Sequence, residues 1–254
     1  MQLSDFSLGG IILFLFMVCG ALALIAVNDR RFMMRILRVF IFYAVSLFFV
    51  TLCLWGVYLI DRWWANALWA FLMALGVTYY LLHKSRLSIR KMFFPLLVGV
   101  VVGLGLVQAI MTMTIPYHGI ALVAPVVGVA AGLMQISLTS GLKSYIASLR
   151  YTKSHYQYMQ ANGATNKETV MPSVKRGLRA AIIPLLNKMI APVVIAPPVF
   201  MLGLLLTGLA PVPAAIITLG LLLSVFASCI LSFAVVLLLS YRVLFDRSGR
   251  FILD

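Results

Sequence analysis

Long apolar runs alternate with short polar segments along the whole chain. A helix needs roughly 20 apolar residues to cross a hydrocarbon core about 30 Å thick. The runs of about this length are Leu8–Val27, Val39–Ile60, Trp63–Leu82, Met92–Met113, Ile120–Leu142, Ala180–Leu209 and Val212–Ser240. They predict an all-α polytopic membrane protein with seven transmembrane helices, forming a single transmembrane domain over residues 1–254. The first run is too long for a cleaved signal peptide, so we interpret it as a true span.

Composition and charge agree with this prediction and give it a direction. The chain of 254 residues is 63% hydrophobic and 10% charged, whereas soluble domains are about 45–50% apolar and about 25% charged. Of its 20 Lys and Arg, 18 fall in segments on one predicted side of the membrane. These segments are Arg30–Arg38, Lys84–Lys91, Lys143–Arg179 and Arg242–Arg250. Since basic segments stay cytoplasmic, we expect the N-terminus outside and the C-terminus inside. The net charge of +14 is then an orientation signal and not a nucleic-acid footprint.

The longest polar segment, Lys143–Arg179, carries local structural signals. Gly163 can end a helix in the left-handed conformation. Thr165 and Glu168 have the spacing of a capping box, with Thr165 at the N-cap. Pro172 is expected to interrupt the helix that follows. The segment is therefore predicted to form a helix, a sharp turn and a short helix. It is either a basic surface loop on anionic lipid or a docking element for a cytoplasmic partner.

The sixth run is unusual because it is rich in proline. The prolines in and just after it are Pro184, Pro192, Pro197, Pro198, Pro211 and Pro213. Proline breaks helical hydrogen bonds, and in lipid the freed carbonyls must be covered by protein or cavity water. We therefore expect a broken helix over Ala191–Gly203, which either lines a transport path or is a kinked packing helix. Gly203 and Gly208 would also allow close helix contact.

Lys188 is the one basic residue inside an apolar run. An ionisable residue in a span is a functional candidate. It lies nine residues after Arg179, however, about 13 Å along a helix, so its side chain can also snorkel to the headgroups. Asn187 beside it can cap freed backbone groups or hydrogen-bond across helices.

Several signatures of chemistry are missing from the sequence. No predicted span contains Asp or Glu, which disfavours proton coupling. No phosphate-binding Gly-x-x-x-x-Gly-Lys-Ser/Thr loop occurs, and no catalytic constellation is evident in the spans. His83, His118 and His155 fall in three separate loops, so we expect no metal site. The chain is therefore not expected to be an enzyme or to carry a cofactor of its own.

Motifs in the second half of the chain resemble a known family. The blocks are Asn162-Gly163-Ala164-Thr165, Arg176 with Arg179-Ala180, Pro184-Leu185-Leu186-Asn187-Lys188-Met189, Pro197-Pro198-Val199-Phe200-Met201-Leu202-Gly203, Thr207-Gly208 and Pro211. Together Tyr158–Ala214 resembles the permease subunit of a small two-component ABC transporter family. Its best-known members are bacterial iron exporters, and plant members act in aluminium tolerance. The resemblance covers about half of the chain.

The resemblance implies a permease of a bacterial inner (plasma) membrane, driven by a separate ATPase that brings ATP and Mg. The family implies a homodimer of permeases with two ATPases, and export of an iron-like metal ion or another small substrate. The residues expected to form the ATPase-docking site are Gln157, Gly163, Ala164, Thr165 and Glu168. Those expected to line or gate the translocation path are Asn187, Met189, Pro197, Pro198, Met201 and Gly203.

The sequence departs from the family pattern at polar positions. Ala196, Leu202 and Leu204 replace the family's Ser, Thr and Gln, and Ala210 and Pro213 replace an Asp and a Glu. Gln157 stands where a Glu typically opens the cytoplasmic helix. Hard cations prefer oxygen or imidazole ligands, so the resemblance supports a permease more firmly than it supports iron. The alternatives are a non-transporting scaffold or regulator, and a channel that works without an ATPase.

Overall fold

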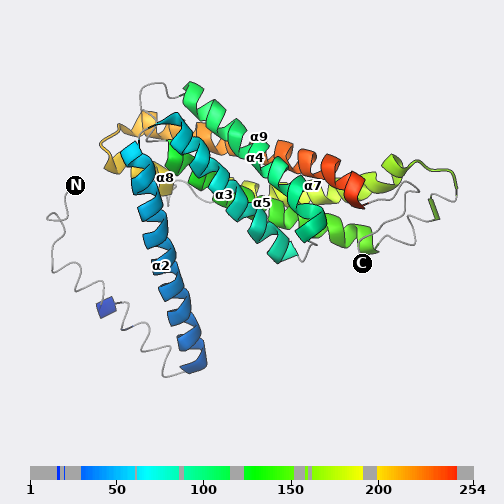
Figure 1. Cartoon of the computed structure of the whole chain (residues 1–254), viewed down its shortest axis with the longest axis horizontal. Helices are drawn as coiled ribbons and strands as arrows, with labels where there is room; N and C mark the ends of the chain where they lie inside the picture. Colours follow the sequence, from blue (N-terminus) through cyan, green and yellow to red (C-terminus); the bar gives the residue numbers. More distant parts are fainter. Residues whose placement is uncertain are drawn as a thin grey trace. The chain divides into compact units, whose positions relative to one another are not determined.

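A computed structural model describes residues 16–17, 20, 30–60, 62–85, 89–114, 123–151, 158–159, 162–190 and 199–244. Every extended regular element in this part of the chain is a helix (Figure 1). The helices are α2 (Arg30–Ile60), α3 (Trp63–Ser85), α4 (Ile89–Thr114), α5 (Val123–Tyr151), α7 (Asn166–Ile190), α8 (Val199–Leu206) and α9 (Pro211–Leu244). The prediction of an all-α fold is confirmed.

Five of the described helices are long and apolar enough to cross a membrane. They cover Arg31–Ile60, Trp63–Ser85, Lys91–Met113, Ala124–Tyr151 and Pro211–Tyr241. These five correspond to the second, third, fourth, fifth and seventh predicted spans. The first predicted span lies almost wholly outside the described residues. The direction in which the helices cross the membrane stays a prediction.

The sixth predicted span begins differently from the expectation. Its first part belongs to α7, which starts at Asn166 in the polar segment and runs to Ile190. Pro172 and Pro184 both lie inside this continuous helix, so the expected interruption at Pro172 is wrong. Buried Val170 and Ser173 hold the helix against the bundle on either side of Pro172. Tertiary packing thus outweighs the local cost of the lost backbone bond.

The chain divides into two compact units, Met1–Gly56 and Val57–Asp254. In the second unit α5 packs against α7 and α3, while α4 packs against α9 and α3. The shared core contains long apolar side chains from each of these helices; fully buried examples are Leu81, Leu96, Met134, Leu138 and Phe233. The Trp69 indole N–H donates to the Ala124 carbonyl at 3.2 Å and ties α3 to the start of α5.

α5 and α7 approach each other closely through two glycines. A Cβ placed on Gly177 would lie 2.9 Å from the Tyr145 Cβ and 3.3 Å from the Gly141 carbonyl oxygen. Two hydrogen bonds reinforce the contact. The Ser137 hydroxyl donates to the Ala181 carbonyl at 2.7 Å, and the Ser148 and Ser173 hydroxyls lie 3.0 Å apart. α7 is therefore fixed to α5 at several levels along its length.

A second pair of glycines, Gly99 and Gly103 of α4, lies where α4 packs closely on α9. A Cβ on Gly103 would collide with the Met134 Cε and lie 3.0 Å from the Ser232 Cβ. Gly99, four residues earlier, faces the Ser232 carbonyl oxygen in the same way, at 3.0 Å. This Gly-x-x-x-Gly spacing lets two helices approach closely in a membrane. The hydropathy pattern of the sequence does not distinguish these two glycines from others in the spans.

Gly203 and Gly208, which the sequence suggested for close helix contact, are not packed against another described helix. Apart from the adjoining residues and the local helix backbone, no atom of the described chain would lie within 4 Å of a Cβ on Gly203 or Gly208. Gly208 has a φ of +87° and ends α8. The Leu209 N–H donates to the Leu204 carbonyl at 3.3 Å, and the Gly208 N–H donates to the Leu205 carbonyl at 3.0 Å. This is a Schellman cap, and Pro211 then begins α9.

Replacement of Gly103 by valine is expected to lower the thermal unfolding midpoint of the purified protein by several degrees. The added side chain overpacks the α4–α9 contact, which costs about 1–3 kcal/mol. Gly105→Val is the matched control, because no described atom lies within 4 Å of a Cβ at that position. Equal midpoints for the two variants would contradict the close packing of α4 on α9.

Candidate partner-docking site

The turn at Asn162–Thr165 is built around Gly163. Its φ of +85° is in the left-handed region that favours glycine. The Ala164 N–H donates to the Met159 carbonyl at 3.0 Å, and the Asn162 backbone and side-chain N–H groups both donate to the Tyr158 carbonyl. These bonds end the preceding helical turn, as the Gly163 signal predicted.

A capping box begins α7 directly after this glycine. The Thr165 backbone N–H donates to the Glu168 Oε2 at 2.9 Å, and the Thr165 hydroxyl donates to the same oxygen at 2.8 Å. In return, the Glu168 N–H donates to the Thr165 Oγ1 at 3.4 Å. The predicted capping box is confirmed, and it fixes the angle at which the chain enters α7.

The capping bonds also lower the pKa of Glu168. The Thr165 backbone N–H contributes most and the Thr165 hydroxyl contributes next, because both stabilise the carboxylate. Since the folded-state pKa lies below the ordinary value of 4.5, the resulting stabilisation is present above 4.5. It is lost as the pH falls through the folded-state pKa.

The titration of Glu168 can be followed directly, because it is the only glutamate in the sequence. In protein labelled with ¹³C-glutamate, we expect its carboxyl signal to titrate with a midpoint below 4.5. Thr165→Ala should raise this midpoint, because one donor is lost, whereas Thr165→Ser should leave it nearly unchanged. A midpoint that Thr165→Ala does not move would show that the hydroxyl makes no contribution.

The turn is exposed, while the helix that follows it is anchored. Gly163, Thr165 and Glu168 are exposed and Ala164 is half-buried. Gln157, the remaining predicted docking residue, lies outside the described residues. Thr169 and Val170, immediately after the capping box, are already buried. A short accessible turn is thus continuous with a helix that is fixed to α5.

The predicted path residues lie on two helices. Asn187 is exposed and Met189 is half-buried near the end of α7. Met201 is half-buried and Gly203 is exposed in α8, which packs on α9. Pro197 and Pro198 come between these helices in the sequence and lie outside the described residues. Lys188 belongs to α7, but its side chain is also outside the described part. The translocation path therefore stays a prediction.

Within the ranges that the structure describes, no three His, Cys, Asp or Glu side chains come together in a way that could hold a metal ion. Glu168 is the only acidic residue among those described, and its carboxylate accepts hydrogen bonds from the Thr165 N–H and hydroxyl.

These features define a multi-pass helical membrane protein with an exposed, capped turn at the start of an anchored helix. The chain matches the family described as "Uncharacterised protein family (UPF0014)" over residues 8–245 and belongs to it. No curated protein and no solved structure matches the chain.

Proposed function

We propose that this chain is the permease subunit of an ABC transporter and that a separate ATPase docks on the turn at Asn162–Glu168. The observation that carries the proposal is the continuity between the turn and α7. The turn is accessible and held by capping bonds, and the helix that it begins is clamped to α5. Membership of a family associated with ABC transporters also supports it.

The proposed mechanism follows from this connection. ATP-driven closure of two ATPases displaces the turns of two permease copies. Because α7 is rigidly bonded to α5 through Ser148–Ser173 and Ser137–Ala181, the displacement reaches the core of the bundle. The two copies then alternate between inward-open and outward-open states. ATP and Mg belong to the partner ATPase, and the permease contributes shape and mechanical coupling.

The proposed cargo is a metal ion of the iron type or another small substrate, moved out of the cell across a bacterial inner membrane. Asn187, Met189 and Met201 are the proposed contacts together with the segment at Pro197 and Pro198. Methionine thioethers suit soft metals or apolar cargo better than hard cations. Stimulation of ATP hydrolysis by candidate metals and lipophilic compounds would identify the cargo class.

Co-expression with a lone ABC ATPase encoded beside the gene tests the partnership. We expect the tagged permease to retain the ATPase through affinity and size-exclusion steps. Failure of any such ATPase to co-purify would overturn the transporter proposal and favour a scaffold or regulator. Ion flux through liposomes that contain the purified chain alone, without ATP, would instead indicate a channel.

A further inference from the structure

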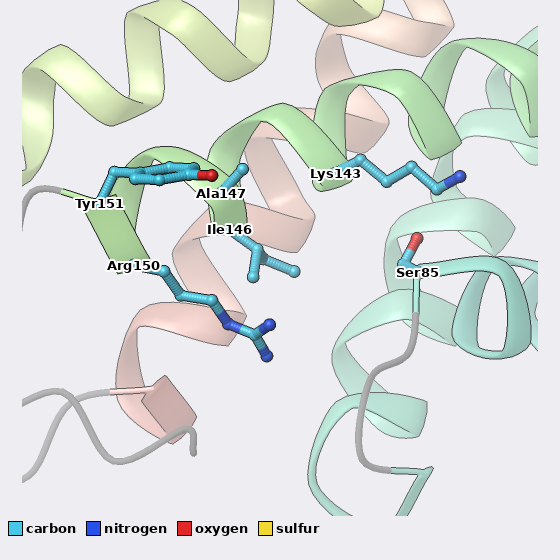
Figure 2. Close-up of a pocket in the computed structure, with 6 residues that line it drawn as sticks. All are labelled: Ser85, Lys143, Ile146, Ala147, Arg150 and Tyr151. Carbon is cyan, nitrogen blue, oxygen red and sulfur yellow. The ribbon is translucent and has the colours of Figure 1, made fainter.

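A pocket of about 370 Å³ opens where the end of α3 approaches the end of α5 (Figure 2). Its lining residues are Ser85 of α3 and Lys143, Ile146, Ala147, Arg150 and Tyr151 of α5. Small-molecule pockets usually measure about 300–1,000 Å³. The pocket therefore has room for one small polar group and part of what is attached to it.

The pocket is positively charged. Lys143 and Arg150 are seven residues apart, so they lie on one face of α5 about two turns from each other. Figure 2 shows both side chains extending from α5 toward the side where Ser85 lies, with Ile146 between them. The lining contains no acidic residue. Glu168 is the only acidic residue in the described part of the chain, and its carboxylate is hydrogen-bonded to Thr165. The two cations thus face the pocket without an acidic partner among the described residues.

Ser85 supplies a second, independent sign of a ligand. Its Oγ is out of contact with solvent and has no hydrogen-bond partner in the described structure. A buried hydroxyl without a partner is costly. Figure 2 shows this hydroxyl on the side of the pocket that Lys143 reaches. Ser85 is thus an unused hydrogen-bond donor in the wall of the pocket that Lys143 also lines.

The helix dipole accounts for only one of the two cations. Arg150 lies in the last turn of α5, where a positive charge stabilises the partial negative charge of the helix end. Lys143 lies eight residues before the end at Tyr151, about 12 Å along the axis. This is beyond the last turn, within which the dipole effect is confined. Lys143 therefore lies beyond the reach of the dipole, and its charge is available to the pocket that it lines.

The pocket lies at the ends of two candidate spans, where phospholipid headgroups are expected. α3 and α5 are both candidate spans, and they end at Ser85 and Tyr151. Tyr151 is 88% exposed, as is typical of aromatic residues at a membrane surface. Ile146 and Ala147 give the pocket an apolar wall. Basic pockets between membrane helices bind anionic headgroups. We propose that this pocket binds a phosphate ester, presented by the headgroup of an anionic phospholipid.

Lipid retention by the purified full-length chain tests this site. The protein in detergent is titrated with phosphatidylglycerol, and bound lipid is counted by native mass spectrometry. Lys143→Gln combined with Arg150→Gln should weaken phosphatidylglycerol binding about tenfold or more, because two charge-assisted hydrogen bonds are lost. Ser85→Ala should give a smaller loss. Lys175→Gln combined with Arg176→Gln is the matched control, since these exposed residues remove the same charge elsewhere.

Each outcome supports or overturns the site. Preference for phosphatidylglycerol over phosphatidylcholine, lost only in the pocket variants, would support it. Equal losses in the pocket and control variants would show attraction to the whole basic surface and overturn it. Saturable binding of inorganic phosphate at Lys143 and Arg150, without retention of lipid, would overturn the lipid source. Unchanged lipid binding with lost ATPase association would assign the two cations to protein docking instead.

Discussion

On the proposed function, Gly163→Pro is expected to weaken association between this chain and the ATPase about thirtyfold or more. Proline fixes φ near −65°, whereas Gly163 has a φ of +85°, so the turn cannot form as it stands. Thr165 and the capping box behind it then lose their position. Loss of a central interface contact costs about 2 kcal/mol or more, which corresponds to roughly thirtyfold weaker binding. Binding is measured with the purified permease in nanodiscs and the isolated ATPase.

Gly163→Asn provides the control for conformation. Asparagine tolerates the left-handed region better than other side chains, so this variant should retain most of the association. No described atom lies within 4 Å of a Cβ at Gly163, and both variants should therefore insert into the membrane and unfold as the parent does. Undiminished ATPase binding by Gly163→Pro, or deletion of Asn162–Thr165 without effect, would refute the docking site.

Gly177→Val is expected to leave ATPase binding intact but to lower permease-dependent ATP hydrolysis. The added side chain would crowd the Tyr145 Cβ and the Gly141 carbonyl oxygen and push α7 away from α5. The turn is held by its own local hydrogen bonds, so the ATPase should still bind. Because α7 no longer moves with α5, permease-dependent ATP hydrolysis should fall on the order of tenfold, as for mutations that alter coupling by about 0.5–2 kcal/mol.

Gly132→Val is the matched control for this prediction. Gly132 also lies on α5, but no described atom would lie within 4 Å of its Cβ. It should leave both binding and hydrolysis near the parent values. If Gly177→Val left hydrolysis unchanged, force would not pass through the α5–α7 contact. If it weakened binding as much as Gly163→Pro, the turn would not be an independent docking element.

Local signals allowed the glycine turn and the capping box at the start of α7 to be predicted from the sequence. Gly163, Thr165 and Glu168 act within a few residues of one another, and the backbone geometry that they favour does not depend on distant contacts. The long apolar helices were predictable for a similar reason, since length and hydropathy are properties of a continuous segment. Five of the seven predicted spans correspond to such helices.

Features that depend on tertiary packing could not be predicted in this way. Pro172 carries a strong local signal for a helix break, but buried neighbours keep α7 continuous through it. Gly141 and Gly177 are far apart in the sequence, and only the packing of α5 on α7 gives them a shared role. The pocket joins Ser85 of one helix to Lys143 of another. In the sequence these cations contributed only to the orientation signal.

Photo-crosslinking from the turn tests the central claim most directly. In one variant of this chain a photo-reactive residue replaces Asn162, beside Gly163. In a second variant it replaces the exposed Leu206 at the end of α8. Each permease is reconstituted with the ATPase and irradiated. The proposed function predicts a covalent product with the ATPase from Asn162 and none from Leu206. Crosslinking from Leu206 but not from Asn162 would contradict it, since the ATPase would then contact a different part of the permease.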